Sequence, residues 1–230
     1  MHGLDLTQKL AISILPAIFA ITVHEAAHGW MAKLLGDKTA EMLGRVTFNP
    51  IKHIDLVGTI MVPLGVYLMT GFIFGWAKPV PVNWNNLHQP KRDMGLVALA
   101  GPGANLIMAL IWAILVYVGA MSLEQFYWFG KPLMYMGVFG VFINSVLMVL
   151  NMMPVPPLDG GRVVYSLLPA KQAQVYSRLE AYGLIIVVIL LVTGIVNVIL
   201  WPLVGLMIKL LPASDIVTQL IPQILSPSRS

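Results

Sequence analysis

The sequence lacks cysteine and is poor in charged residues, and each shortage excludes a class of protein. Without cysteine there is no disulfide framework and no thiolate metal site, so any metal must be held by histidine and carboxylate side chains. Only 10% of the 230 residues are charged, whereas a soluble domain carries about 25%. Because 58% of the residues are hydrophobic and the mean hydropathy is +0.82, a soluble globular protein is excluded.

The basic residues are few and scattered. The formal net charge is +4, but the lysines and arginines lie between apolar runs and are not clustered with interleaved aromatic residues, as a nucleic-acid groove requires. We therefore expect no nucleic-acid partner. The positive surplus is better interpreted as a signal of membrane topology.

Long apolar runs dominate the chain, and each approaches the roughly 20 residues that cross about 30 Å of hydrocarbon. They lie near residues 10–32, 57–75, 96–121, 133–154 and 183–209. The second run contains four glycines and Pro63, which make a poor spanning helix. We expect this run to enter the membrane and return. The sequence thus predicts an all-α polytopic membrane protein with about four transmembrane helices and one re-entrant segment.

Two polar segments, residues 36–56 and 76–95, separate the first three runs and contain proline and asparagine. The sequence VPVN at 80–83 predicts short membrane-associated β-strands in this region. Neither segment is long enough for an inserted globular domain of about 50 residues or more. We therefore expect residues 1–230 to form a single membrane-embedded domain, with a core at about 10–210 and a tail at 211–230.

An HExxH motif, formed by His24, Glu25 and His28, lies near the end of the first apolar run. On a helix, residues i and i+4 share a face, so both imidazoles can bind one zinc ion, and the intervening glutamate can act as a general base. The alternative is a chance spacing on a surface helix. A charged side chain near mid-membrane costs about 2.5–3.5 kcal/mol, which favours the functional interpretation.

A catalytic zinc usually has three protein ligands, so a third is needed from elsewhere in the chain. Asp159 lies in the sequence NMMPVPPLDGGR at 151–162, where three prolines end an apolar run and two glycines follow the aspartate. Irregular backbone at membrane depth is tolerated where it lines a cavity or is buried in protein, so Asp159 can point inward as the third ligand. Alone, this sequence would read as an Asp-Gly surface turn.

Together, the two motifs strongly resemble those of the site-2 protease family of intramembrane zinc proteases. Further matches are GRVTFNP at 44–50, HID at 53–55, GWAKPVPVN at 75–83 and AGPGAN at 100–105. The resemblance covers about residues 10–170. The chain has no room for the PDZ or CBS domains that many relatives carry, so it would be a compact member.

The resemblance implies a role for each motif residue. His24, His28 and Asp159 would bind one zinc ion per chain, Glu25 would be the catalytic base and Asn151 a catalytic helper near the site. The expected reaction is hydrolysis of peptide bonds in or near transmembrane segments, as in regulated intramembrane proteolysis. The expected partners are transmembrane protein substrates and the lipid bilayer, with the oligomeric state left open.

Topology tests whether the two motifs can share a metal. Both lie at the C-terminal ends of their apolar runs, so the two helices must cross the membrane in the same direction. With the start of the chain outside, ten of the fourteen basic residues fall on the cytoplasmic side, in agreement with the positive-inside rule. We therefore expect a multi-pass protein of the bacterial inner (cell) membrane with its active site towards the cytosolic face.

The main alternative is a membrane metal-ion transporter that uses the His/Asp cluster as an ion site. A transporter does not need a glutamate between the two histidines, and its ligands should be spread across the depth of the bilayer. A non-catalytic scaffold would not require an intact ligand set. His53 and His88 are expected to be hydrogen-bonded or solvated, and Asn105 and Asn144 to make hydrogen bonds between helices.

Overall fold

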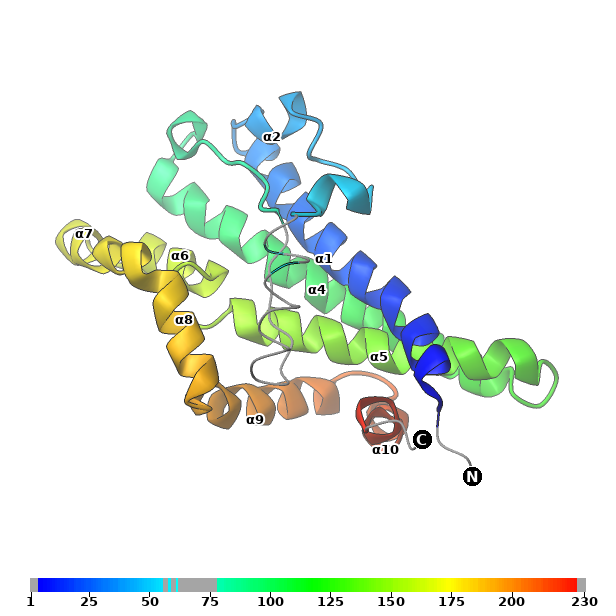
Figure 1. The fold of residues 1–230 in the computed structure, drawn as a ribbon. Coiled ribbons are helices and arrows are strands. Elements are labelled where there is room, and N and C mark those ends of the chain that lie inside the picture. The colour runs from blue at the N-terminus through cyan, green and yellow to red at the C-terminus, as the bar shows by residue number, and fades with distance from the viewer. Residues whose placement is uncertain (1–3, 56–57, 59–60, 62–77, 227–230) are drawn as a thin grey trace.

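The computed structural model describes residues 4–55, 58, 61 and 78–226, and within these residues the regular structure is helical. The helices are α1 (Leu6–Leu34), α2 (Thr39–Met42), η1 (Pro50–His53), η3 (Trp84–Asn86), α4 (Pro90–Met121), α5 (Tyr127–Asn151), α6 (Asp159–Leu167), α7 (Ala170–Ser177), η4 (Arg178–Tyr182), α8 (Gly183–Val192), α9 (Ile195–Leu210) and α10 (Ser214–Leu225). Helices α1, α4 and α5 are the longest and form the centre of the molecule (Figure 1).

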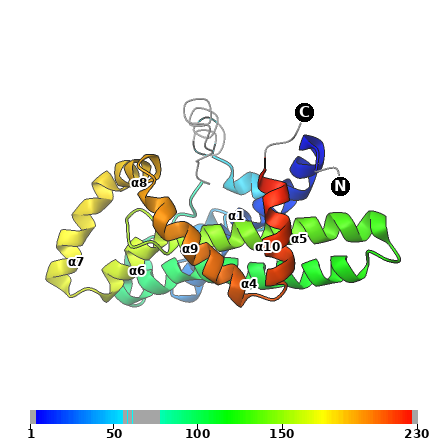
Figure 2. The ribbon, with the colours of Figure 1, turned by 90° about the horizontal axis from the view of Figure 1, so that it is seen from below.

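Helices α4 and α5 form an antiparallel hairpin and lie side by side along their length (Figure 2). Their contact is close because glycines of α5 face the partner helix, as small residues do where membrane helices pack. Trp112 and Val116 of α4 and Val138 and Val141 of α5 are buried in this contact. Helix α1 packs against both members of the hairpin.

Four helical stretches are long and apolar enough to cross a membrane: Leu6–Leu34, Pro90–Met121, Tyr127–Asn151 and Ala170–Leu190. The predicted number of spans is therefore confirmed for the described residues, but the predicted fourth span, 183–209, is wrong. That apolar run is broken at Gly194, whose φ of 75° lies in the left-handed region where glycine commonly follows a helix end. Helix α8 ends before it, and α9 starts a new direction (Figure 1).

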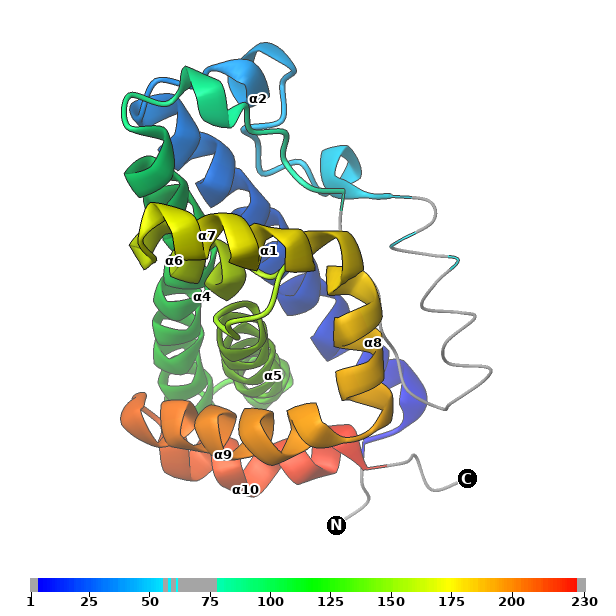
Figure 3. The same cartoon turned by 90° about the vertical axis from the view of Figure 1, so that its left-hand side faces the viewer.

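Helices α9 and α10 lie beneath the central hairpin when α5 is viewed end-on (Figure 3). Val196, Leu200 and Val204 form a stripe along α9 that is buried against α5. The rings of Phe142 and Trp201 stack between the same two helices, with their centroids 6.2 Å apart. The predicted tail contains α10, which is held by the hydrogen bond from the Tyr135 hydroxyl to Gln223 at 2.8 Å. Most of this tail therefore packs with the core.

The predicted β-strands are not present in the described residues. Residues 78–83 have no strand pairing, although the Lys78 N–H donates to the His53 carbonyl oxygen at 2.9 Å. Side chains occupy two more backbone donors, since the Val80 N–H donates to Glu25 and the Asn83 N–H to Asp37. Pro79 and Pro81 have no N–H to offer. A ladder needs a run of free donors, and in this segment only the Val82 N–H makes no hydrogen bond to the described residues.

The two motifs lie at one level because α1 and α5 run in the same direction, whereas α4, which lies between them in the sequence, runs in the opposite direction (Figure 1). The hydrogen bond between the Lys78 N–H and the His53 carbonyl oxygen places the residues on either side of segment 54–77 next to each other. The predicted re-entrant segment, 57–75, lies outside the described residues apart from Gly58 and Met61.

Candidate metal centre

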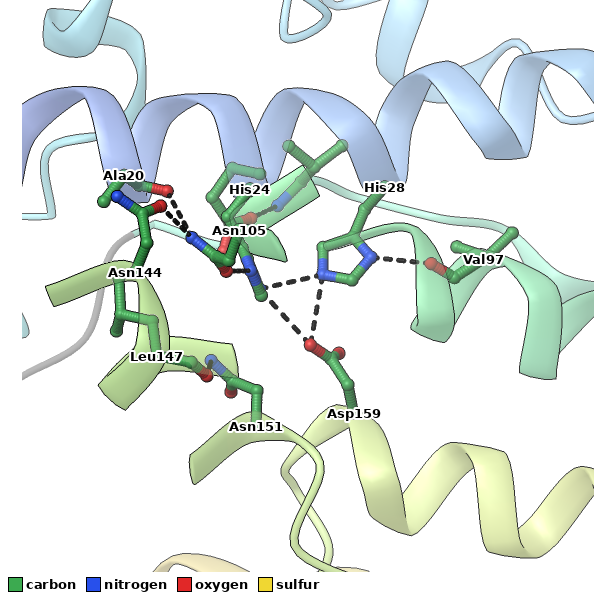
Figure 4. A network of polar contacts seen from close by, with 11 residues as sticks. Ala20, His24, His28, Val97, Asn105, Asn144, Leu147, Asn151 and Asp159 are labelled. Atoms are coloured by element: carbon green, nitrogen blue, oxygen red, sulfur yellow. Dashed lines mark hydrogen bonds and ion pairs between the residues drawn. The ribbon is translucent and has the colours of Figure 1, made fainter. Parts of the chain in front are cut away.

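Helices α1 and α6 bring the three predicted ligands together. The Nε2 atoms of His24 and His28 lie 3.1 Å apart, and Oδ2 of Asp159 lies 3.2 Å from the first and 3.3 Å from the second. All three side chains point towards one point between the helices (Figure 4). They are buried, with 7%, 9% and 6% of their surfaces exposed, respectively. Residues 131 positions apart in the sequence thus form one cluster.

The hydrogen bond made by Nδ1 of each imidazole determines whether Nε2, the nitrogen that faces the cluster, carries a proton. Nδ1 of His28 lies 2.7 Å from the Val97 carbonyl oxygen, which only accepts, so this nitrogen carries the proton. Nδ1 of His24 lies 2.6 Å from Oδ1 of Asn105 and donates in the same way. In a neutral imidazole the other nitrogen is then a bare acceptor. Both Nε2 atoms therefore present lone pairs to the cluster.

The cluster fits a zinc ion on chemical and geometric grounds. Two imidazole lone pairs face Oδ2 of Asp159, a buried oxygen with no hydrogen-bond donor among the described residues. Three electron-pair donors this close repel one another unless a cation lies between them. Ligands about 2.0–2.1 Å from a tetrahedral zinc are separated by about 3.3 Å, which matches the observed distances. The described residues contain no other cluster of this kind.

Glycine makes the space that the imidazoles occupy. Gly101 of α4 faces α1, and a Cβ atom there would lie 2.4 Å from Nε2 of His28 and 2.6 Å from Cε1 of His24. Gly160 lets the chain before α6 pass directly over the start of that helix, because a Cβ there would lie 2.3 Å from the Met152 carbonyl oxygen. The first turn of α6 thereby carries Asp159 to the histidines. A side chain at position 101 would displace an imidazole, and one at position 160 would displace the backbone at Met152 and Met153.

Glu25 lies on α1 between the two histidines and is half-buried. Its Oε2 atom accepts a hydrogen bond from the Val80 N–H at 2.9 Å, which holds the carboxylate beside the extended segment 78–83. Arg45 anchors that segment, since its Nη2 donates to the Lys78 carbonyl oxygen at 2.9 Å. The predicted base is therefore oriented by backbone that a buried arginine keeps in place.

Asp37 anchors the other end of the same segment. It is fully buried and accepts hydrogen bonds from the Asn83 N–H at 2.7 Å, from Nδ2 of Asn86 at 3.0 Å and from the hydroxyl and N–H of Thr39. Burial by itself raises the pKa of the Asp37 carboxyl, but these donors outweigh it and hold the pKa below its usual range. Asp37 is therefore ionised at neutral pH and ties the end of α1 to the polar segment.

Asn151, the predicted catalytic helper, lies near the cluster but does not contact it by a hydrogen bond in the described structure. Its Nδ2 donates to the Leu147 carbonyl oxygen of its own helix at 3.0 Å (Figure 4). Its catalytic role stays a prediction. His53 is hydrogen-bonded to the Thr47 carbonyl oxygen at 3.0 Å, as expected.

The sequence interpretation missed the role of Asn105. The expectation was a bond between helices, and this is confirmed by its bonds to Ala20 of α1 and Asn144 of α5. Its contact with His24 was not foreseen. The available signal was its position four residues after Gly101, on the same face of α4.

An apolar groove of about 330 Å³ lies between α1 and α4. Two of its lining residues, Val23 and Ala104, are sequence neighbours of His24 and Asn105, but no residue of the metal cluster lines it. Its lining has no charged side chain and consists of Phe19, Val23, Phe48, Ala104, Ile107, Met108 and Ile111. The groove therefore offers an apolar surface beside α1, the helix that carries His24 and His28.

Comparison with known proteins gives a consistent result. The family model described as Peptidase family M50 matches residues 12–130 and 128–194. The chain is 38% identical over 203 residues to the "Putative zinc metalloprotease YwhC" of Bacillus subtilis, which covers 88% of each chain. It is 28% identical over 187 residues to the "Putative zinc metalloprotease Rip2" of Mycolicibacterium smegmatis, covering 78% of this chain and 66% of that one. No solved structure matches.

Proposed function

Because the chain belongs to peptidase family M50 and is a membrane metalloprotease, we propose that it is an intramembrane protease of the site-2 type. We further propose that it binds one zinc ion through His24, His28 and Asp159. The proposed reaction is hydrolysis of peptide bonds in or near transmembrane segments of other proteins. The proposed setting is the bacterial inner membrane, with the active site towards the cytosolic face.

One observation carries this proposal. Three electron-pair donors converge within hydrogen-bonding distance of one another: two lie on α1, which is long and apolar enough to span a membrane, and the third lies at the start of the short helix α6. Glu25 lies between the two histidines in the sequence. Zinc, when bound, acts as a Lewis acid and makes water nucleophilic at neutral pH. The chain has no cysteine, so this donor set is also the type of site its composition permits.

Glu25 is placed to move the proton in this reaction. One carboxylate oxygen is held by the Val80 N–H, while Oε1 makes no hydrogen bond to the described residues. Oε1 can accept a proton from water and later return it to the amine that leaves the scissile peptide bond. His24, His28 and Asp159 keep fixed positions during this transfer, because each is buried and held by its own helix.

A substrate helix must unwind locally before it can react. In an α-helix each carbonyl oxygen is hydrogen-bonded to an N–H four residues later, which shields the peptide group from attack. The apolar groove between α1 and α4 offers a place for apolar side chains of such a segment. We propose that the preferred substrates are transmembrane segments with helix-breaking residues near the peptide bond that is cleaved.

The transporter alternative is not favoured. An ion path needs ligands at several depths, but in the described residues the candidate metal-binding groups form one cluster at one level. Transport would also leave Glu25, held against Val80 beside the ligands, without a role.

The substitution Glu25→Gln tests the proposed function. Glutamine keeps the size of the side chain and can still accept from the Val80 N–H, but it cannot take up the proton. Cleavage of a transmembrane substrate in detergent should fall by at least about 10²- to 10⁴-fold, while the zinc content should stay at the wild-type value. Wild-type cleavage by this variant, or cleavage that survives removal of zinc by a chelator, would show that the proposal is wrong.

A further inference from the structure

A chain of side-chain amides connects the metal cluster to the backbone of α5. Asn105 of α4 and Asn144 of α5 are both fully buried between the long helices, and they contact each other at 2.9 Å. Asn105 then contacts His24 at 2.6 Å (Figure 4). Two buried amides in an apolar bundle are costly unless every polar atom is paired, so the pattern of their bonds is informative.

The direction of each bond in this chain is fixed by carbonyl oxygens at its far end. Nδ2 of Asn144 faces the Gly140 carbonyl oxygen at 2.8 Å, which only accepts, so the Oδ1 of Asn144 faces Asn105. Nδ2 of Asn105 donates to that oxygen and also to the Ala20 carbonyl oxygen at 3.2 Å. Two acceptors on one side leave only one orientation for the Asn105 amide. Its oxygen must face Nδ1 of His24.

We infer that Asn105, oriented by Asn144, is a positioning residue that holds His24 in the tautomer and ring orientation required for metal binding. An oxygen at Nδ1 keeps the proton there and leaves the lone pair on Nε2, which points to His28 and Asp159. This inference rests on the zinc site in the proposed function. Asn105 acts through His24 and does not touch the metal cluster itself.

The two histidines are therefore supported differently. The partner of His28 is the backbone carbonyl of Val97, which no substitution removes, whereas the partner of His24 is a side chain. Only His24 can therefore lose the hydrogen-bond partner of its Nδ1 through a substitution. Removal of such a supporting partner typically costs about 10- to 100-fold in metal affinity.

The test compares Asn105→Ala with Asn105→Asp in the purified full-length protein. Alanine removes the acceptor, so the zinc dissociation constant, measured by competition with a chromophoric chelator, should rise by about 10- to 100-fold. Aspartate retains an acceptor for His24 and should keep zinc affinity near the wild-type value. Aspartate also turns a second oxygen towards the Ala20 carbonyl, so the zinc-free protein should unfold at a lower temperature than wild type.

Asn144→Ala and Ser145→Ala provide a matched pair. Both residues are fully buried on α5, and each donates to a backbone carbonyl four residues earlier, at 2.8 and 2.7 Å. Asn144→Ala should weaken zinc binding by less than Asn105→Ala, because the bond to Ala20 still orients the amide. Ser145→Ala should leave the zinc dissociation constant unchanged. The visible spectrum of the cobalt-loaded protein should shift in Asn105→Ala but not in Ser145→Ala.

The outcomes separate this inference from the proposed function. If wild type fails to bind zinc, the proposed function is wrong. If wild type binds zinc and Asn105→Ala binds it equally well, or if alanine and aspartate weaken it to the same extent, Asn105 has only a packing role and the inference is overturned.

Discussion

Helices α1, α4 and α5 build two ends of one bundle, and the two ends use glycine for different purposes. At the metal end, Gly101 leaves room for the imidazoles of His24 and His28. At the other end, Gly137 of α5 leaves room for α4, because a Cβ there would lie 2.7 Å from Cγ2 and 2.9 Å from the backbone nitrogen of Val116. The first glycine makes space for chemistry, and the second brings two helices together. We therefore expect a substitution of Gly101 to lower zinc affinity and a substitution of Gly137 to lower stability.

The largest effect is expected at the metal end. In Gly101→Ala the new methyl group would overlap the ligand atom Nε2 of His28, so zinc affinity should fall by at least about 10- to 100-fold. The control is Gly103→Ala on the same helix, where a Cβ meets nothing within 4 Å. Zinc titration of both variants checks this expectation. Equal zinc affinity in the two variants would show that the imidazoles do not occupy the place described.

The next effect is expected at the opposite end. Gly137→Ala should lower the free energy of unfolding by about 1–3 kcal/mol, because the methyl group presses on the α4 backbone. The zinc affinity of the folded protein should not change. Gly205→Ala on α9 is the control, since nothing lies within 4 Å of its Cβ. Thermal unfolding in detergent and zinc titration check both expectations. If Gly137→Ala loses zinc affinity but keeps its stability, the two ends of the bundle do not differ in the way described.

A smaller effect should follow from loosening the segment that holds the base. Arg45→Met removes the donor to the Lys78 carbonyl oxygen and so weakens the position of the Val80 N–H against Glu25. A charged hydrogen bond contributes about 1.5 kcal/mol, which corresponds to about a tenfold lower cleavage rate. Zinc content should be unchanged. The control is Lys52→Met at an exposed position, which should cleave at the wild-type rate. If Arg45→Met also cleaves at the wild-type rate, Arg45 does not help to position Glu25.

The smallest effect concerns Asp37 and depends on pH. Its pKa is lower in the folded than in the unfolded chain, so its ionised form stabilises the fold above the unfolded pKa of about 3.9, and this contribution is lost as the pH falls through the folded pKa. Asp37→Asn should therefore lower stability by about 0.5–1.5 kcal/mol near pH 7. The difference from wild type should shrink below about pH 4. A difference in unfolding temperature that is constant from pH 7 to pH 3 would contradict this assignment.

The cluster of His24, His28 and Asp159 could be predicted from the sequence because it depends on local rules. The i, i+4 spacing places His24 and His28 on one helix face, and the prolines and glycines around Asp159 mark where a helix must stop. The break between α8 and α9 could also have been found, since Gly194 interrupts the run that was predicted to span. Hydropathy alone does not detect a single left-handed residue.

Other features could not be predicted, because they depend on how separate elements meet. Which atom of Asn105 faces His24 is decided by the rotation of α4 against α1 and by the carbonyl of Ala20. The predicted strand at 80–83 is wrong because Glu25 and Asp37, both distant in sequence, accept from two of its backbone N–H groups and Pro81 has none. Pattern and propensity do not report partners of this kind.

The most direct test of the central claim is the zinc content of purified wild type and Asp159→Ala, with X-ray absorption at the zinc edge to identify the ligands. We expect about one zinc per wild-type chain with two imidazole ligands and a carboxylate, and much lower occupancy in the variant, because a catalytic zinc typically requires three protein ligands. Full zinc retention in Asp159→Ala would contradict it and remove Asp159 from the metal site.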